Sequence, residues 1–217
     1  MTPIFKTRGS IMPLAELQNL TNKNVIDISV NIGDTTKFLK KYCKSIHATD
    51  IRTGMFKPKD ISFSKLDVED IKQLTEIIKN KDVLTSFGLF YHLQSHWNIL
   101  KTLCYSDLQY FFIETLCGLD SPNPTMIWGL ENTQNQMNAY SDSEEMVMHG
   151  VPNMIWIAQT VKCFGASVQL VVRRYEKWRV HEPEDQRWRM LIKIVPNTTD
   201  SFDVSSIPIN KEGTWTI

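Results

Sequence analysis

The chain has 217 residues, of which 42% are hydrophobic and 22% charged, and this length and composition are typical of one α/β domain with a full core. Lys plus Arg and Asp plus Glu both total 24, and a formal charge of zero argues against a protein built mainly to hold a phosphate backbone. No apolar run approaches the length of a membrane span. We therefore expect a single domain over residues 1–217.

The cysteines indicate the redox compartment. Cys43, Cys104, Cys117 and Cys163 show neither CxxC spacing nor the compact framework of a small secreted domain, so reduced thiols are expected and no metal site is predicted. The first residues also lack the charged-then-apolar pattern of a signal peptide. These features favour a cytoplasmic protein without a membrane partner.

The first predicted element is a short helix within residues 1–23. Leu14, Leu17 and Leu20 recur there at steps of three, which is typical of an amphipathic helix. We expect this helix to cap the domain, and one possible position for it is over the ligand site.

A buried strand is predicted at residues 24–28, followed by a tight turn and a helix that starts near Thr35. Such a turn presents free backbone N–H groups, and small residues in it allow a ligand to approach the main chain. Asp27 is an acid within this strand, where a carboxylate is costly unless it has a partner. It either bonds turn amides or a cationic ligand group, or it caps the next helix.

The next strands also end in acids. Residues 45–50 form the second predicted strand, and Asp50 lies twenty-three positions beyond Asp27. This spacing fits the second strand of a nucleoside-binding βαβ unit, where an acid accepts hydrogen bonds from the ribose hydroxyls. A solvated turn residue is the alternative for Asp50. The third strand, residues 63–68, contains Asp67, which meets an adenine amino group or caps the helix predicted at residues 68–80.

The fourth strand, residues 81–87, ends at Gly88. Because parallel strands end at the same edge of a sheet, the loop from Gly88 to His92 should lie beside Asp27 and Asp50. A fifth strand is expected at residues 111–116.

Residues 118–150 are the longest stretch without clear periodicity, and a loop of this length is usually functional or disordered. We interpret it as an acceptor-binding lid or as an insertion without contact to substrate. A helix follows, with Pro152 near its start and Gly165 just past its end.

Two strands at residues 168–175 and 188–195 form a predicted antiparallel hairpin. Its basic residues are Arg173, Arg174, Lys177, Arg179, Arg187, Arg189 and Lys193. Basic residues interleaved with Trp178 and Trp188 suit RNA contact, but nearby acids dilute the charge, which favours a solvated hairpin or a subunit contact.

Four segments, residues 25–36, 46–52, 66–68 and 83–93, resemble in order and spacing the cofactor motifs of class I S-adenosylmethionine-dependent methyltransferases. Three further segments, GLFYHL from Gly88, IETL from Ile113 and GVPN from Gly150, are similar to the tRNA uridine 5-oxyacetic acid (carboxy)methyltransferase group. The resemblance spans residues 24–195. It implies a doubly wound, Rossmann-like, seven-stranded, mostly parallel sheet with a C-terminal antiparallel hairpin.

The resemblance implies S-adenosylmethionine (SAM) as cofactor, with Asp27 near its methionyl amino group, Asp50 on the ribose, and Asp67 with Val68 around the adenine. The residues that it assigns to the cofactor are Asp27, Ser29, Asn31, Gly33, Thr36, Asp50, Ile51, Asp67, Val68, Phe87, Gly88 and Phe90. The family usually has glycine at the position of Ser29 and often at that of Asn31. An NAD-type site fails more clearly, since GxGxxG requires two further glycines in this turn.

A protonated acceptor also needs a base, and the candidates are His92, Tyr91 and Glu114, with His149 the least favoured. The sequence therefore predicts a SAM-dependent methyltransferase that acts on a small-molecule acceptor. Transfer of a methyl or carboxymethyl group to an RNA base is one alternative. A catalytically silent cofactor-binding or partner-binding protein, suggested by Ser29 and Asn31, is the other.

Overall fold

The computed structural model describes residues 11–118, 121, 123–132, 146–177 and 186–198. In chain order the elements are α1 (Leu14–Asn19), β1 (Asn24–Ile28), α2 (Asp34–Leu39), β2 (Ser45–Asp50), β3 (Ser62–Lys65), α3 (Ile71–Ile78), β4 (Val83–Phe87), the 3₁₀ turn η2 (Phe90–His92), α4 (His96–Cys104), β5 (Tyr110–Cys117), β6 (Met126–Asn132), β7 (Met146–Pro152), α5 (Met154–Cys163), β8 (Ser167–Lys177) and β9 (Gln186–Val195). No helix within these residues is long and apolar enough to cross a membrane.

The main sheet has seven strands in the order β3-β2-β1-β4-β5-β9-β8. Strands β1 to β5 pair in parallel, and β9 runs antiparallel to both β5 and β8. This arrangement confirms the predicted mostly parallel sheet and its antiparallel hairpin. The carboxyl ends of β1, β2 and β4 share one edge of the sheet, as a parallel arrangement requires.

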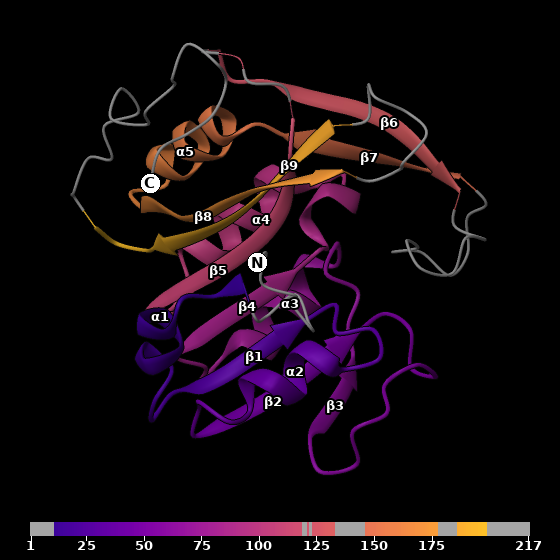
Figure 1. Ribbon diagram of the computed structural model, residues 1–217, viewed down its shortest axis with the longest axis vertical. Helices are drawn as coiled ribbons and strands as arrows, with labels where there is room; N and C mark the ends of the chain where they lie inside the picture. Colours follow the sequence, from indigo (N-terminus) through magenta and orange to yellow (C-terminus); the bar gives the residue numbers. More distant parts are fainter. Residues whose placement is uncertain (1–10, 119–120, 122, 133–145, 178–185, 199–217) are drawn as a thin grey trace.

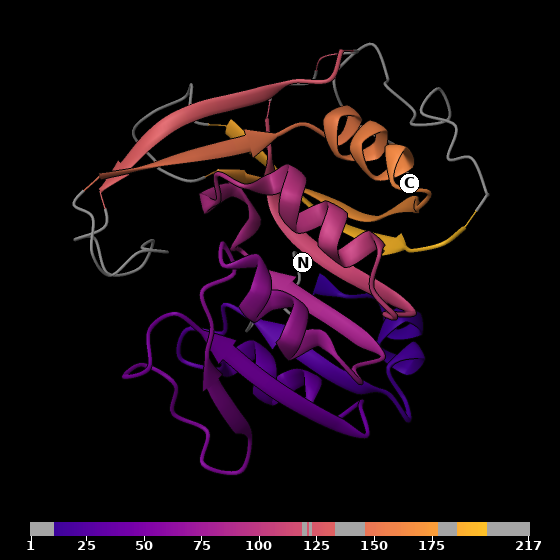
Figure 2. The same ribbon diagram turned by 180° about the vertical axis from the view of Figure 1, so that it is seen from behind.

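Helices cover both faces of the sheet (Figures 1 and 2). On one face, buried side chains of α1 and α2 such as Leu17 and Leu39 pack against Val25 and Phe112 of the sheet. On the other face, a larger core joins the sheet to α3, α4 and α5. The sheet is therefore apolar on both faces, which explains why its strands are near-continuous hydrophobic runs.

Helix ends follow from local side-chain chemistry. Asp70 caps α3 and accepts hydrogen bonds from the backbone N–H groups of Lys72 and Gln73. Asn153 caps α5 and accepts from the N–H of Trp156 at 2.8 Å, and Gly165, at φ 70°, follows the end of that helix. Each cap satisfies N–H groups that have no partner within the helix.

The helix α1 lies away from the strand ends that carry the predicted site. The Tyr110 hydroxyl, at the start of β5, donates to the Asn19 carbonyl, and Lys193 of β9 pairs with Glu16 at 2.8 Å. Tyr110 marks the amino end of β5, whereas the predicted ligand residues follow the carboxyl ends. The expectation that α1 covers the ligand site is therefore wrong.

Residues 118–150 contain two strands where the sequence indicated a long loop. Strands β6 and β7 pair antiparallel in a separate two-stranded sheet, which we call the ribbon, while residues 133–145 lie outside the described part of the chain. Apolar side chains occur on both faces of the ribbon, among them Ile127 and Val147 on one and Trp128 and Met148 on the other. This pattern has no period of two, so no strand could be predicted for these residues.

Candidate functional site

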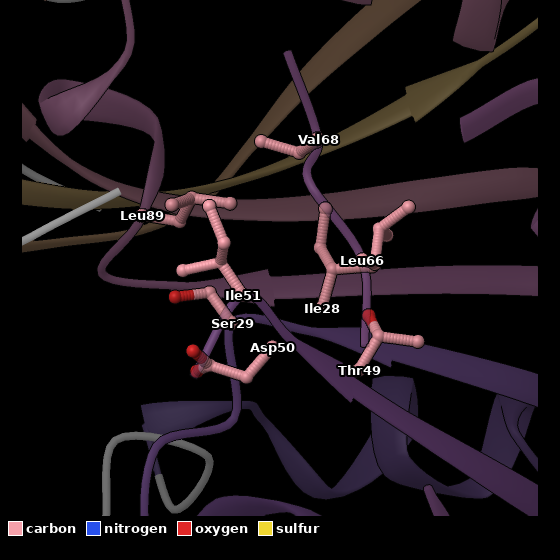
Figure 3. A pocket seen from close by; sticks show the side chains of 8 residues that line it. All are labelled: Ile28, Ser29, Thr49, Asp50, Ile51, Leu66, Val68 and Leu89. Carbon is pink, nitrogen blue, oxygen red and sulfur yellow. The ribbon is translucent and has the colours of Figure 1, made fainter. Parts of the chain in front are cut away.

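A pocket opens where β1, β2, β3 and β4 end, on the side of the sheet that α3 and α4 cover. Its lining residues are Ile28, Ser29, Thr49, Asp50, Ile51, Leu66, Val68 and Leu89 (Figure 3). The Ser29 hydroxyl and the Asp50 carboxylate point to the same side of the pocket, and aliphatic side chains form most of the remaining wall. A flat apolar ring beside a hydroxyl-bearing group would match this division.

Asp50 is held by the main chain on both sides. One carboxylate oxygen, Oδ2, accepts the Asn31 N–H at 2.9 Å, and the other, Oδ1, accepts the Arg52 N–H at 2.9 Å. Arg52 Nε also lies 3.3 Å from Oδ1. Each carboxylate oxygen has two lone pairs, so Asp50 keeps acceptor capacity for donors from a ligand.

The turn after β1 has the backbone path of a glycine-rich turn although it has one glycine. Ser29, Asn31 and Gly33 have φ values of 61°, 51° and 88°, all in the left-handed region that glycine favours. Asparagine tolerates this region better than most residues, and serine is small. Ser29 and Asn31 replace glycines of the family pattern, but the turn keeps the left-handed conformation at both positions.

Gly33 is the position in this turn where a side chain has no room. An added Cβ atom would lie 2.7 Å from Phe56 Cε2 and 2.8 Å from Pro58 Cδ. We expect Gly33→Ala to lower the free energy of unfolding by about 1–3 kcal/mol, because it adds this clash to a positive φ. Urea denaturation would measure the loss. The matched control is Gly54→Ala, where no atom lies within 4 Å of the new Cβ; equal stabilities of the two variants would contradict the prediction.

Asp27 is buried beneath the turn instead of lining the pocket. Its oxygens accept the hydroxyls of Thr36 and Thr85, each at 2.7 Å, which ties α2 and β4 to β1. Side chains alternate along a strand, so Asp27 faces α2 while Ile28 faces the pocket. Both Asp27 and Thr36 are thus placed in the fold without contact to the pocket, and their assignment to the cofactor stays a prediction.

Burial raises the pKa of Asp27 from 3.8 to about 6, against the opposing effect of the two threonine hydroxyls. Between these pH values the folded protein binds more protons at this site than the unfolded chain does. The free energy of unfolding should therefore fall as the pH rises from 4 to 6, by about 3 kcal/mol from this group alone.

Denaturant titrations of the wild type and of Asp27→Asn across pH 4–7 would isolate this contribution, since asparagine does not ionise. The difference in stability between the two proteins should change in favour of Asp27→Asn as the pH rises. Parallel stability curves would show that Asp27 does not titrate in this range.

The remaining predicted cofactor residues are divided between the pocket and the core. Ile51 and Val68 line the pocket, but the Asp67 carboxylate accepts the Glu69 N–H at 2.9 Å in the turn before α3. The strand β3 also ends at Lys65, three residues earlier than expected.

Phe87 is buried on the α1 and α2 side of the sheet, and Phe90 is buried on the other side. Gly88 has φ 77° and donates its N–H to the Glu114 carbonyl, so it turns the chain after β4.

Helix α4 and the ribbon fix the η2 turn. His96 Nε2 donates to the Phe90 carbonyl at 2.7 Å, and His149 Nδ1 donates to the Tyr91 carbonyl at 3.0 Å. Burial lowers the pKa of His96 to about 4, so its ring is neutral at physiological pH and suits this donor role. The His149 ring lies over Gly129 of the ribbon, where a Cβ atom would be 2.7 Å from Nε2. His149 therefore acts as a support for Tyr91 in this structure.

His92, the third residue of η2, has its imidazole Nδ1 2.7 Å from a carboxylate oxygen of Glu131 in β6. Its side chain is 9% exposed and that of Glu131 13%. The Tyr91 and His92 rings lie 4.1 Å apart between centroids. The turn and the ribbon thus share a buried Glu–His pair.

Tyr91 and Glu114 belong to a second buried polar group. Arg189 of β9 lies 3.1 Å from Glu114 Oε1, and its other terminal nitrogen lies 3.4 Å from the Tyr91 hydroxyl. Glu114 is fully buried and Arg189 is 2% exposed. A carboxylate that neutralises a buried guanidinium is poorly placed to remove a proton from an acceptor, so this geometry does not support the catalytic role predicted for Glu114.

Sequence reasoning missed several residues that the structure brings to the site. Ile28, Thr49, Leu66 and Leu89 line the pocket, and Glu131 pairs with His92. Ile28 ends a predicted strand, Leu66 lies inside one, and Leu89 belongs to the loop from Gly88 to His92 that was expected at this edge, so these positions were the available signals. Nothing in the sequence pairs Glu131 with His92. In the described part of the chain, no group of three His, Cys, Asp or Glu side chains is arranged as metal ligands.

Comparisons with known proteins identify the fold. No protein-family model matches the chain, and a search of curated proteins gave no significant match. Among solved structures, the N-terminal domain of EvdMO1 with S-adenosylhomocysteine (SAH) bound is similar with a TM-score of 0.64 and 11% identity, over 89% of this chain and 82% of that one.

Two further structures agree with this finding. An S-adenosylmethionine-dependent methyltransferase from Mesorhizobium loti has a TM-score of 0.56 and 9% identity, over 86% of this chain and 94% of its own. The 1,6-didemethyltoxoflavin-N1-methyltransferase from Burkholderia thailandensis has a TM-score of 0.53 and 13% identity, over 88% of this chain and 77% of that one. With the strand order described above, this chain has the fold of the class I SAM-dependent methyltransferases.

Proposed function

We propose that this protein is a SAM-dependent methyltransferase that acts on a small-molecule acceptor. The observation that carries the proposal is the Asp50 carboxylate in a pocket with aliphatic walls at the carboxyl ends of β1 and β2. A carboxylate at this place in a doubly wound sheet is suited to ribose hydroxyls, and the aliphatic wall is suited to an adenine ring. Structures of this fold include proteins with SAH bound, which supports the same cofactor here.

The residues present fit such a cofactor. Asn31, whose backbone N–H bonds the Asp50 carboxylate, carries a side-chain oxygen, Oδ1, that is buried and has no hydrogen-bond partner among the described residues. A buried acceptor without a partner is costly, so a ligand donor at this position would stabilise the turn. Ser29 and Asp50 would hold the polar part of the nucleoside, and Ile51, Val68 and Leu89 its ring.

SAM supplies a methyl group on a sulfonium, which is an electrophile with its own leaving group. The protein then has to bind the nucleoside, align an acceptor in line with the methyl group and accept any proton that the acceptor loses. Of the predicted catalytic residues, His92 is the one whose contacts suit a proton acceptor. Tyr91 lies between His92 and Arg189, where it supports the ring that it contacts.

The described part of the hairpin gives little support to the RNA alternative. Arg189 is buried against Glu114, and Lys193 pairs with Glu16 and lies 4.7 Å from the centre of the Tyr110 ring. Both cations are therefore used within the fold. Arg179 lies outside the described residues, as do the side chains of Arg174, Lys177, Arg187 and both hairpin tryptophans.

The silent alternative rested on Ser29 and Asn31, and both residues adopt the left-handed conformation that the turn requires. This observation favours a functional cofactor site. A cytoplasmic location remains part of the proposal, and the free thiols of the four cysteines are consistent with a reducing compartment.

Calorimetric titration of the purified chain with SAM and with SAH tests the proposal. We expect micromolar binding of both compounds with one site per chain. A folded chain that binds neither compound would contradict the proposed function and favour a partner-binding protein.

A further inference from the structure

The ribbon contributes an acid to the turn that carries the candidate base. Glu131 belongs to β6, thirty-nine positions beyond His92 in the chain, and its carboxylate lies 2.7 Å from His92 Nδ1. The ribbon also holds the neighbouring backbone, since His149 bonds the Tyr91 carbonyl and the Gly150 N–H donates to the Leu93 carbonyl at 2.9 Å. The ribbon thus contacts the His92 ring through Glu131 and holds the backbone on either side of His92.

A carboxylate accepts hydrogen bonds, so in the neutral ring the proton of His92 lies on Nδ1. The two ring nitrogens point in different directions, and Nε2 then carries a free lone pair. No described residue bonds Nε2. Leu89, three residues before His92, lines the nucleoside pocket, which places the turn at the same edge of the sheet.

We propose that Glu131 is a positioning residue that holds His92 as a general base, and that the acceptor is a group that keeps its proton at neutral pH, such as a phenolic hydroxyl or a ring N–H. This inference rests on the proposed function. The acceptor's O–H or N–H bond breaks and its proton moves to His92 Nε2. The acceptor's electron pair forms the bond to the methyl carbon, while the pair of the methyl–sulfur bond stays on sulfur. The imidazolium beside Glu131 then returns its proton to water.

The surroundings support this role. The groups that face the His92 ring are Glu131 from β6 and the Tyr91 ring. Tyr91 in turn contacts Arg189 from β9 through its ring and His149 from β7 through its carbonyl. Arg189 is already paired with Glu114, so Glu131 is the described carboxylate that compensates a positive charge on His92. A carboxylate bonded to one ring nitrogen of a histidine favours one tautomer and stabilises the protonated ring, which is the arrangement that general-base catalysis uses.

The first test needs neither cofactor nor acceptor. Nitrogen-15 spectra of the full chain, labelled at its five histidines, report which ring nitrogen carries the proton, and His92→Asn identifies the His92 signals. We expect the Nδ1–H tautomer in the wild type, its loss in Glu131→Ala, and its recovery in Glu131→Gln, because the amide carbonyl still accepts a proton from Nδ1. The matched control is Glu76→Gln, an exposed acid of α3 that pairs with Lys79. Retention of the Nδ1–H tautomer in Glu131→Ala would overturn the proposal.

The second test measures transfer from radiolabelled SAM to two sets of acceptors. Catechol and a hydroxypyridine carry a proton on the acceptor atom, whereas benzoate and a thioether do not. We expect methylation within the first set, a kcat about 100-fold or more lower in His92→Asn, and one at least about tenfold lower in Glu131→Ala. Methylation of the second set alone, or of neither set, would count against the acceptor class.

Calorimetry with SAH separates the two possible failures. Glu131→Ala and His92→Asn should bind SAH as the wild type does, because neither residue lines the nucleoside pocket. If the wild type itself does not bind SAH, the proposed function fails. If SAH binds but the His92 tautomer is unchanged by Glu131→Ala, the role of Glu131 fails while the proposed function stands.

Discussion

Asp50→Ala is expected to weaken the binding of SAH about 10- to 100-fold. The Asp50 carboxylate is the charged side chain of the nucleoside pocket, and it has acceptor capacity left after its bonds to Asn31 and Arg52. Arg52 uses both acceptor sites of Oδ1 and Asn31 uses one of Oδ2, which leaves one site for a ribose hydroxyl. A hydrogen bond to a charged group contributes about 1.5–3 kcal/mol, so the loss of this ribose contact should weaken binding about 10- to 100-fold. Isothermal titration calorimetry with SAH would measure the change.

Two controls separate loss of ligand contacts from loss of the turn. Asp50→Asn keeps one oxygen acceptor and should retain more affinity than Asp50→Ala does. Asp60→Ala removes an exposed acid that pairs with Lys40 outside the pocket, and it should bind SAH like the wild type. Unchanged affinity in a folded Asp50→Ala protein would show that the nucleoside does not bind at the end of β2.

The central strands of the sheet could be predicted because they are buried on both faces and are bounded by turns. The structure confirms residues 24–28 and 45–50 as strands β1 and β2 with the expected ends. Residues 24–28 read as a short apolar, β-branched run interrupted by one acid, and residues 45–50 read as a short strand that ends in an acid. The ribbon was missed because its strands show neither pattern. Gly129, Glu131 and His149 interrupt the apolar run, and the apolar residues that remain lie on both faces, so they do not alternate.

The site could be predicted where it depends on topology and not where it depends on side-chain direction. Parallel strands bring their carboxyl ends together, so Ser29, Asp50 and Ile51 were assigned to the pocket that the structure shows. Alternation along β4 places Phe87 on the far face, and Leu89 lies at the pocket wall where Phe87 and Phe90 were expected. Partners such as Arg189 and Glu114 lie seventy-five positions apart, and only the packing of β9 against β5 brings them together.

The buried pair of Glu114 and Arg189 gives the largest expected effect on stability. Glu114→Gln removes the Glu114 charge from the buried Arg189 guanidinium, and breaking a buried ion pair in this way costs about 3–5 kcal/mol. We expect the free energy of unfolding in urea to fall by this amount. A catalytic role for Glu114 predicts a different outcome, in which stability is close to that of the wild type and the effect appears in kcat.

The double variant Glu114→Leu with Arg189→Met is the control, because apolar residues of similar volume often replace a buried ion pair without loss of stability. It should recover most of the stability that Glu114→Gln loses, although the Tyr91 hydroxyl no longer has its contact with Arg189. SAH should bind to the double variant as to the wild type, since neither residue lines the pocket. If the double variant is no more stable than Glu114→Gln, the two charges do not depend on one another. If Glu114→Gln unfolds like the wild type, Glu114 returns to the candidates for acceptor chemistry.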